Sequence, residues 1–513
     1  MTITGTVLAE TAYGTVAGVS HEGIAAFRGI PYAAPPLGEN RFGAPVPPEP
    51  WDGVRDAFEF GPTAPKPVIE GRLGELMPDP VVAGDEWLNL NVWTPDPGAA
   101  GLPVMVWIHG GAFITGSSAV AAYDGATFAR DGVICVTVNY RLGVEGFACL
   151  PDAPVPANRG LRDQIFALEW VRDNIARFGG DPDDVTVFGQ SAGGMSVLTL
   201  LSLDLGLFRR AIVQSGTAHV AQSMGDAALV TRAVAARLDV EPTARALAGV
   251  GVEEIVKAQS EVCSDVRTHA DAARYGRSTI AACGISFMPV IDGDLVTQRP
   301  IDAIAAGAGR DIPLLIGTNT EEFRLFVVPT SLLDRPGAMP FRTWTEVYGA
   351  APEFWDTYAR NTTASYPRRT PSGIACAVLS DRMFRIPTCR VAEARAGAPA
   401  PTYVYEFGRR PSVAPHTLRS ELGACHGAEI PFVWDTLDSP DSRRLIGPHP
   451  PRELATVLHT TWREFARTGT AGWERYGPGT RAVMTYGHDN GPENLVVHDP
   501  RQEERALWEG VLD

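Results

Sequence analysis

Ser191 lies in a Gly-x-Ser-x-Gly pattern within residues 185–194, VTVFGQSAGG. The chain has 53 glycines, so the pattern alone is a weak signal, and a glycine turn with an incidental serine is the alternative. Here, however, a short apolar stretch precedes it and an apolar run typical of a helix follows it. A strand that turns sharply into a helix exposes its central serine. The pattern therefore predicts that Ser191 is a nucleophile, beside a helix N-terminus that favours developing negative charge.

Two glycines that follow a predicted strand are candidates for binding an oxyanion. Residues 102–108, LPVMVWI, predict a buried strand that runs directly into His109, Gly110 and Gly111. Because consecutive glycines let backbone amides turn toward one point, we expect the amides of Gly110, Gly111 and Ala192 to form an oxyanion hole. His109 is not chosen as a base, since a histidine at such a strand end more often braces its loop.

Several longer segments resemble the type B carboxylesterases, the cholinesterase and para-nitrobenzyl esterase branch of the α/β-hydrolases. They are FRGIPYA at 27–33, LNLNVW at 88–93, HGGAF at 109–113, NYRLG at 139–143, GLRDQ at 160–164 and FGGDP at 178–182, together with the serine segment. The resemblance covers most of the chain. It implies an α/β-hydrolase fold, with a mostly parallel central sheet flanked by helices, and hydrolysis of carboxylic esters.

The resemblance places the acid of a Ser-His-Glu triad after another strand. Residues 312–319, IPLLIGTN, predict this strand, and a Glu-Glu pair follows it. The family carries its acid in a loop similar to Gly-Thr-x-x-Asp-Glu-Gly, which aligns Glu322 with the acid. Glu321 stays an alternative, because only the spacing from Gly317 separates two adjacent carboxylates. Phe323 stands where the family usually has glycine, which predicts a different loop contour beside the acid.

His426, in residues 424–434, ACHGAEIPFVW, resembles the family segment His-x-x-Glu-x-Pro-Phe-Val and is the candidate base. Imidazole has an ordinary pKa of about 6.5, so it can accept the Ser191 proton and return it to a leaving alcohol near neutral pH. The resemblance also implies that Ser215 supports the acid through a hydrogen bond. Gln190 stands where the family most often has glutamate, so any help from a carboxylate there is missing.

The implied chemistry is acyl transfer in two steps, with Glu322 fixing the tautomer of His426. We expect a general esterase for small, largely apolar esters with short to medium acyl groups, rather than a choline esterase. No metal-ligand spacing or phosphate loop is present in the sequence, so no cofactor and no metal are implied. The alternatives are an acyltransferase on the same triad and a non-catalytic cholinesterase-like binding module, which retention of all three residues disfavours.

The motifs run from residue 27 to beyond residue 426 of the 513, so we expect a single catalytic domain, residues 1–513. An N-terminal strand pair is predicted at about 3–30. The sheet strands are predicted near 88–93, 103–108, 133–139, 185–189, 211–214, 312–317 and 402–407, with an amphipathic helix at 161–178. Helical patterns at about 220–285 and 330–400 predict insertions that cover the active-site cleft.

A formal net charge of -16 argues against nucleic acid as a partner and leaves a small-molecule ester. Seven cysteines, an odd number, do not suggest a disulfide framework, although Cys263 and Cys283 could pair. Secreted animal members of the family have a cysteine where this chain has Trp87, so that disulfide is not expected. The sequence starts without a signal-peptide pattern and has no membrane-span window. We expect a cytoplasmic protein that is a monomer or a weak homo-oligomer.

Overall fold

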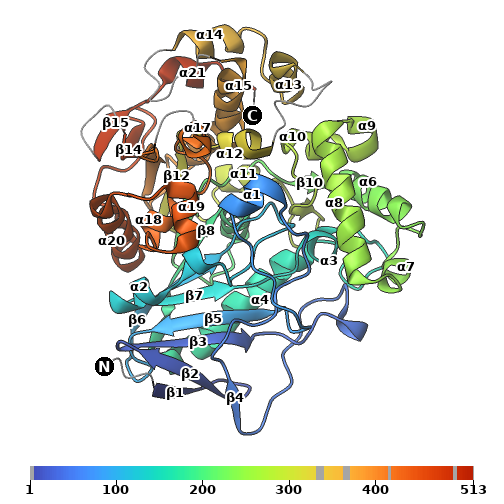
Figure 1. The fold of residues 1–513 in the computed structure, drawn as a ribbon, viewed down its shortest axis with the longest axis vertical. Helices are drawn as coiled ribbons and strands as arrows, with labels where there is room; N and C mark the ends of the chain where they lie inside the picture. The colour runs from blue at the N-terminus through green and yellow to red at the C-terminus, as the bar shows by residue number, and fades with distance from the viewer. Residues whose placement is uncertain (1–4, 331–339, 362–369, 414–416, 489–493, 512–513) are drawn as a thin grey trace.

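The computed structural model describes residues 5–330, 340–361, 370–413, 417–488 and 494–511 (Figure 1). Within these residues, one sheet of 13 strands has the order β1-β2-β3-β5-β7-β6-β8-β9-β12-β13-β14-β15, with β4 paired to β2. Its strands are β1 (Gly5–Glu10), β2 (Thr15–His21), β3 (Ile24–Pro31), β4 (Val54–Asp56), β5 (Asn89–Thr94), β6 (Leu102–Ile108), β7 (Ile134–Val138), β8 (Gly180–Gln190), β9 (Arg210–Gln214), β12 (Leu314–Asn319), β13 (Thr402–Phe407), β14 (Ala482–Tyr486) and β15 (Leu495–His498). A separate parallel pair joins β10 (Gln222–Ser223) to β11 (Val290–Ile291).

The centre of the large sheet is parallel and its margins are antiparallel. Strands β7, β6, β8, β9, β12, β13 and β14 pair in parallel. Strands β1, β2, β3 and β5 and the terminal β15 pair antiparallel. Parallel sheets are usually covered on both faces, so their strands need apolar side chains on both faces. The central strands have such continuous apolar runs. The mostly parallel sheet predicted from the sequence is confirmed.

Helices cover both faces of this sheet. The described helices are α1 (Gly71–Leu76), α2 (Ala126–Arg130), α3 (Gly143–Phe147), α4 (Arg159–Asn174), α5 (Ala192–Leu201), α6 (Met224–Arg237), α7 (Ala244–Ala248), α8 (Val252–Thr268), α9 (Ala272–Tyr275), α10 (Arg277–Ala281), α11 (Pro300–Ala305), α12 (Arg324–Val327), α13 (Phe341–Val347), α14 (Phe354–Arg360), α15 (Pro371–Ser380), α16 (Ile386–Ala394), α17 (Leu418–Leu422), α18 (Ile430–Val433), α19 (Pro440–Ile446), α20 (Arg452–Thr468) and α21 (Gln502–Ala506).

Alternating side chains of β6 enter two different cores. Val104 and Val106 belong to a cluster that includes Leu161 and Leu168 of α4. Trp107, between them and the strand end, belongs to a cluster on the other face that includes residues of α20. Because successive side chains of a strand point to opposite faces, this strand, buried from Val104 to Ile108, is anchored on both sides. Its C-terminal end therefore offers a rigid support for the loop that follows.

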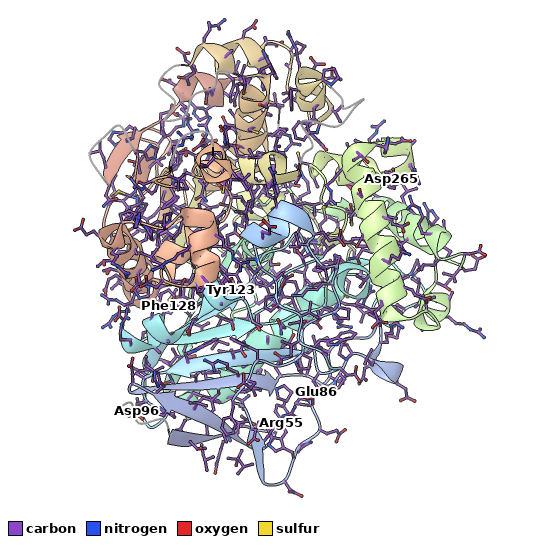
Figure 2. The ribbon with its side chains drawn as sticks, in the orientation of Figure 1. Arg55, Glu86, Asp96, Tyr123, Phe128 and Asp265 are labelled. Atoms are coloured by element: carbon purple, nitrogen blue, oxygen red, sulfur yellow. The ribbon has the colours of Figure 1, made fainter. Side chains whose placement is uncertain are left out.

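An aromatic cluster joins the C-terminal part of the chain to the sheet. Trp434, four residues after α18 begins, packs against Phe188 of β8 and Trp107 of β6, with ring centroids 5.4 and 5.3 Å apart. Tyr123 and Phe128, both labelled in Figure 2, pack on the same indole at 5.7 and 5.4 Å. These contacts attach the segment that carries His426 to the strand that ends at Gln190.

The predicted helix at 161–178 is α4 followed by one tighter turn, Ile175–Phe178. Gly179, with φ of 90°, ends it in the left-handed conformation that glycine tolerates best. The predicted N-terminal strand pair is in fact three strands, β1 to β3. Strands β14 and β15, which close the other margin of the sheet, were not predicted.

The two predicted insertions are mainly helical where the structure describes them. Helices α6 to α10 lie together on one side of the sheet, shown in green in Figure 1. Helices α13 to α15 lie at the far end of the molecule from β1 (Figure 1). A small core of its own, with Phe354, Tyr358, Ile374 and Trp508, ties α14 and α15 to the C-terminal segment.

All seven cysteines are free thiols, so the possible pair of Cys263 and Cys283 is not formed. Trp87 stands where the resemblance places a cysteine in secreted animal members. It is buried, and its indole Nε1–H donates to the carbonyl of Gly84 at 2.8 Å. No helix in the described residues has the length and apolar character needed to cross a membrane.

Candidate active site

Ser191 lies at the sharp turn between β8 and α5. Its backbone has φ 58° and ψ −124°, a conformation that residues other than glycine rarely adopt. The turn requires small neighbours, because a Cβ atom on Gly193 would overlap the carbonyl oxygen of Ile108. The amide of Ser191 donates to the carbonyl of Gln214 at 2.9 Å, which ties the turn to β9. The serine is thus held in a strained, fixed position at the end of the parallel strands.

Glu322 and His426 are brought into direct contact. Oε2 of Glu322 lies 2.6 Å from Nδ1 of His426, and both side chains are buried. The other carboxylate oxygen, Oε1, accepts hydrogen bonds from the Ser215 hydroxyl at 2.5 Å and the Asn319 amide at 2.7 Å. Since an ionised carboxylate only accepts hydrogen bonds, Nδ1 of His426 carries a proton and the lone pair of the neutral ring is on Nε2.

Glu321 points away from this contact. Its Oε2 accepts hydrogen bonds from the Ala424 amide at 2.8 Å and from Nε of Arg410 at 3.0 Å. Arg324 lies 3.6 Å from the other oxygen. Burial raises the pKa of the Glu321 carboxyl, and the two arginines act against that rise. The geometry therefore separates the two adjacent carboxylates that the sequence left open.

Nε2 of His426 contacts Gln190 and not Ser191. The side-chain amide nitrogen of Gln190 lies 3.0 Å from Nε2. Among the described residues, the Ser191 hydroxyl forms no hydrogen bond with His426. The imidazole is also packed against two rings, Phe326 at 5.1 Å and Phe384 at 4.8 Å between centroids. The structure therefore brings the acid and the base together. The side chain that contacts Nε2 of the base belongs to Gln190, the residue immediately before Ser191.

Two of the predicted oxyanion residues, Gly110 and Ala192, adjoin Ser191. A Cβ atom on Gly110 would lie 3.0 Å from Cβ of Ser191, so the glycine loop after β6 packs directly on the turn. Gly111 has φ 119° and Ala112 has φ 52°, which curl this loop. The amides of Gly110, Gly111 and Ala192 donate no hydrogen bond to any residue that the structure describes. They are available to an oxygen atom held above Ser191.

His109 braces this loop. Its ring stacks on Tyr140 with centroids 4.5 Å apart, and Nδ1 lies 2.8 Å from the carbonyl oxygen of Gly110. The Tyr140 hydroxyl donates to the carbonyl of His109 at 2.8 Å. Burial lowers the pKa of His109 to about 4, so the ring is neutral at neutral pH and holds the loop as a hydrogen-bond donor.

A third buried carboxylate near the site was missed by the sequence reasoning. Glu429 accepts hydrogen bonds from the side-chain amides of Gln214 at 3.0 Å and Asn319 at 2.6 Å. Burial and the nearby Glu322 both raise the pKa of the Glu429 carboxyl. The only available signal was the glutamate three positions after His426 in the family segment, and that spacing does not say which groups it meets.

A cavity of about 100 Å³ opens beside the glycine loop. Gly110, Gly111, Gln190 and Gly427 form its inner wall. The remaining wall is mostly apolar, contributed by Ile69, Leu76, Met77, Pro78, Val120, Ala122, Tyr123, Ile430, Pro431 and Leu445. The cavity adjoins the predicted oxyanion residues and is shaped to hold an apolar group.

Both acidic side chains in the wall of this cavity are paired with a cation, Asp79 with Lys66 and Asp441 with Arg444, whose Nε lies 3.9 Å from Asp441 Oδ1. Asp79, in its wall, forms a buried ion pair with Lys66. The same pair holds the glycine loop, because Lys66 donates to the carbonyl of Gly116 at 3.1 Å and Asp79 accepts from the Gly116 amide at 2.8 Å. Burial lowers the pKa of Lys66, and Asp79 opposes that change. Asp79 therefore does not offer an unpaired negative charge to a ligand.

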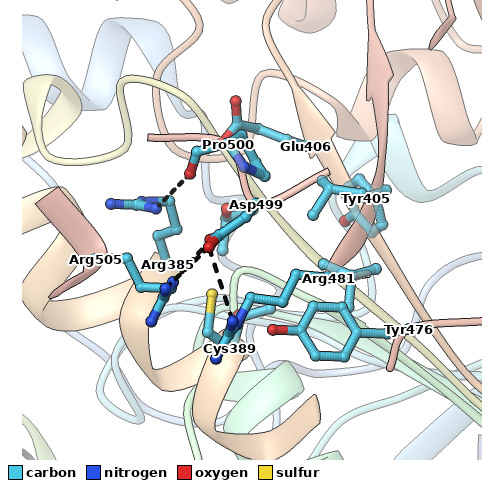
Figure 3. A pocket seen from close by; sticks show the side chains of 13 residues that line it. Arg385, Cys389, Tyr405, Glu406, Tyr476, Arg481, Asp499, Pro500 and Arg505 are labelled. Carbon is cyan, nitrogen blue, oxygen red and sulfur yellow. Dashed lines mark hydrogen bonds and ion pairs between the residues drawn. The ribbon is translucent and has the colours of Figure 1, made fainter. Parts of the chain in front are cut away.

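A second, smaller cavity lies away from these groups (Figure 3). It measures about 20 Å³, and its walls include neither Gln190 nor the glycine loop. Neither cavity is lined by Ser191, Glu322 or His426, but the larger one is lined by Gly110, Gly111 and Gln190, which adjoin Ser191 and His426. Cys389 lines it, and burial raises the pKa of this thiol to about 11, so it is not a thiolate nucleophile at neutral pH.

Comparison with known proteins gives a consistent result. The sequence profile of the carboxylesterase family matches residues 6–496. The para-nitrobenzyl esterase of Bacillus subtilis (strain 168) is 36% identical, over 97% of this chain and 97% of its own. The fumonisin B1 esterase of Sphingopyxis macrogoltabida is 34% identical, over 94% of this chain and 86% of its own. A carboxylesterase crystal structure from Geobacillus stearothermophilus has a TM-score of 0.82 at 34% identity, covering 98% of this chain and 99% of that one.

Proposed function

Because this chain belongs to the carboxylesterase family and has its α/β-hydrolase fold, we propose that this carboxylic ester hydrolase works through a Ser191, His426 and Glu322 triad. The observation that carries the proposal is the buried 2.6 Å contact between Glu322 and His426, next to a strained turn that presents Ser191. Glu322, just after β12, and His426, in the loop before α18, are in contact, and Ser191 follows Gln190, whose side chain contacts Nε2 of His426. A triad needs the Ser191 hydroxyl to take the place of the Gln190 amide at Nε2 during the reaction.

The reaction proceeds through an acyl-enzyme intermediate. Oγ of Ser191 attacks the ester carbonyl carbon while Nε2 of His426 takes the hydroxyl proton. The carbonyl oxygen becomes an oxyanion, which the amides of Gly110, Gly111 and Ala192 bind. When the bond to the leaving alcohol breaks, Nε2 gives its proton to the alcohol oxygen. Water then loses a proton to Nε2 and attacks the acyl carbon, and the carboxylic acid leaves as Ser191 regains a proton.

Glu322 acts on the base rather than on the substrate. By accepting from Nδ1, its carboxylate keeps the imidazole in the tautomer whose Nε2 lone pair can take a proton. Ser215 and Asn319 in turn hold the carboxylate through Oε1. These partners restrain the acid, and the carboxylate stabilises the imidazolium that forms in each step.

The substrates we propose are small, largely apolar esters. The cavity beside the glycine loop has a mostly apolar wall, and its two acidic residues, Asp79 and Asp441, are paired with Lys66 and Arg444. The name of one relative, para-nitrobenzyl esterase, supports a small organic ester as the substrate. A short to medium acyl group stays our prediction.

We also infer that the helical segments at 220–285 and 330–400 cover the site and shape substrate choice within a single catalytic domain. Two contacts support this for the second segment. Phe384 packs on the imidazole of His426, and Trp344 of α13 packs on Phe323, the residue that follows the acid, at 5.8 Å. A cytoplasmic location and a monomeric or weakly associated state are further predictions.

The test is an ester panel with acyl chains from acetyl to decanoyl, run on the wild type, Ser191→Ala and a control, Ser202→Ala. Ser202 lies at the other end of α5. We expect Ser191→Ala to lose about 10⁴-fold or more in kcat and the control to keep its activity. Full activity of Ser191→Ala would remove the proposal. Adding a competing alcohol and analysing the products distinguishes hydrolysis from acyl transfer.

A further inference from the structure

The base of the proposed triad is already engaged by a neighbour of the nucleophile. The side-chain amide nitrogen of Gln190 lies 3.0 Å from Nε2 of His426, and both residues are buried, with 3% and 2% of their surface exposed. Nδ1 donates to Glu322, so in the neutral ring Nε2 is a bare acceptor. An amide N–H is the part of the glutamine side chain that fits this acceptor.

The place of Gln190 is set by glycines on both sides. Its Oε1 lies 3.0 Å from where a Cβ atom on Gly110 would be, and its Nε2 lies 3.9 Å from the same position on Gly427. Gln190 also lines the cavity that we assign to the substrate. Its side chain therefore spans from the oxyanion loop to the base, and a substrate that fills the cavity contacts it.

We propose that Gln190 is a positioning residue for the base: its amide holds Nε2 of His426 before substrate binds and yields this atom to the Ser191 hydroxyl during the reaction. This inference rests on the proposed function. It accounts for the absence of a hydrogen bond between Ser191 and His426 among the described residues. The amide N–H is a donor that only an unprotonated Nε2 can accept, whereas a carboxylate at this place would pair only with a protonated Nε2.

The charges around the imidazole give the amide a specific consequence. Glu322 faces Nδ1, and Glu429 lies behind it on Asn319, which also donates to Glu322. Glu321 is held by the Ala424 amide and by arginines. Against the ring itself the structure places the uncharged side chains of Phe326 and Phe384. A carboxylate at position 190 would add another negative charge beside Nε2. It could only accept a hydrogen bond, so it would need a proton on Nε2.

The neutral amide thus keeps the base in its active form at lower pH than a glutamate would. Two substitutions separate its effects. Gln190→Glu replaces the donor by a charge, and Gln190→Met keeps the length and removes the donor. In plots of kcat/KM against pH, we expect the acid limb to move up by about one pH unit in Gln190→Glu and by about half a unit in Gln190→Met.

The control is Gln259→Glu, at another buried glutamine. Oε1 of Gln259 accepts from the Val144 amide at 2.8 Å, a bond that a carboxylate retains, so this variant introduces a buried charge away from the base. Its acid limb should coincide with that of the wild type. Thermal unfolding identifies any variant that fails to fold. A merely structural role for Gln190 would lower the rate at every pH without moving the limb.

The inference is overturned if either Gln190 variant that folds has the acid limb of the wild type, or if that limb moves to lower pH. A shift in Gln190→Glu alone would mean that charge acts at this position but that the amide does not hold Nε2, and it also overturns the proposal. Activity of Ser191→Ala, assayed in parallel, reports separately on the proposed function. If Ser191→Ala is inactive while both limbs are unmoved, only the role of Gln190 is wrong.

Discussion

Oε2 of Glu322 lies 2.6 Å from Nδ1 of His426, while its neighbour Glu321 binds the Ala424 amide and Arg410. Two carboxylates adjacent in the sequence thus have different environments. One is held by a serine hydroxyl and a backbone amide and faces an imidazole. The other is compensated by arginines and supports the loop that carries His426. This difference provides a matched pair of substitutions.

Glu322→Gln and Glu321→Gln should separate catalysis from support. We expect the first to lower kcat by about 10³–10⁴-fold, because a neutral amide no longer fixes the proton on Nδ1. The second should change kcat by less than about fivefold, although losing an ion-paired buried charge lowers the free energy of unfolding. The measurement is kcat on a p-nitrophenyl ester with thermal unfolding of both variants. Equal losses of kcat in the two variants would contradict the assignment of the acid.

Ser215→Ala should weaken the hold on the acid without removing it. The variant loses the 2.5 Å hydrogen bond to Oε1 of Glu322, while the Asn319 amide still donates to the same oxygen. A hydrogen bond to a charged group contributes about 2 kcal/mol, which corresponds to about a 30-fold fall in kcat. Steady-state kinetics at saturating ester measures it. An unchanged kcat would show that Ser215 has no part in holding the carboxylate.

His109 should make stability depend on pH. Its pKa is lowered to about 4 in the folded protein, against about 6.5 in the unfolded chain. Between these values the unfolded chain binds a proton that the folded protein does not. The stability that the neutral His109 contributes is therefore complete above pH 6.5 and is lost as pH falls toward 4, by at most about 3.4 kcal/mol.

His109→Phe tests this, because a phenyl ring keeps the stack on Tyr140 and cannot be protonated. We expect the unfolding free energy of the variant to fall less steeply than that of the wild type between pH 6.5 and 4. The measurement is denaturant unfolding at several pH values. Parallel curves for the two proteins would exclude His109 as a source of the acid sensitivity.

Val120→Phe should narrow the cavity beside the glycine loop, because Val120 lies in its wall. We expect KM for esters with bulky apolar groups to rise by about tenfold or more, while small acetate esters are affected little. Val457→Phe is the matched control, since Val457 is exposed on α20 and does not line the cavity. The assignment of the cavity to the substrate fails if bulky and small esters are affected equally.

Much of the fold follows from local patterns. The apolar runs at β6 to β9, β12 and β13 were predicted because parallel strands buried on both faces are continuously apolar. The short β14 and β15, at the margin of the sheet, have weaker patterns and were missed. The order of strands, with β6 between β7 and β8, depends on contacts between distant segments and cannot be read from any one of them.

The site divides in the same way. Ser191 and its glycines follow from a local turn, and the acid and base follow from family segments. The sequence could not separate Glu321 from Glu322, because that choice depends on which side chain meets Arg410. It also could not place Gln190 on Nε2 or Glu429 on Asn319, since these contacts depend on side-chain directions in the folded protein. Position 323, where this chain has phenylalanine in place of the family's usual glycine, does not require glycine, since its φ of −72° is an ordinary value for any residue.

The most direct test of the central claim is covalent labelling with a fluorophosphonate, followed by digestion and mass spectrometry. In the proposed mechanism, Ser191 carries the activated hydroxyl, and it lies beside the amides that bind the oxyanion. We predict one adduct per chain, on the peptide that contains Ser191, with activity lost in proportion to labelling and no adduct in Ser191→Ala. An adduct on a different residue, or full activity after stoichiometric labelling, would contradict the account.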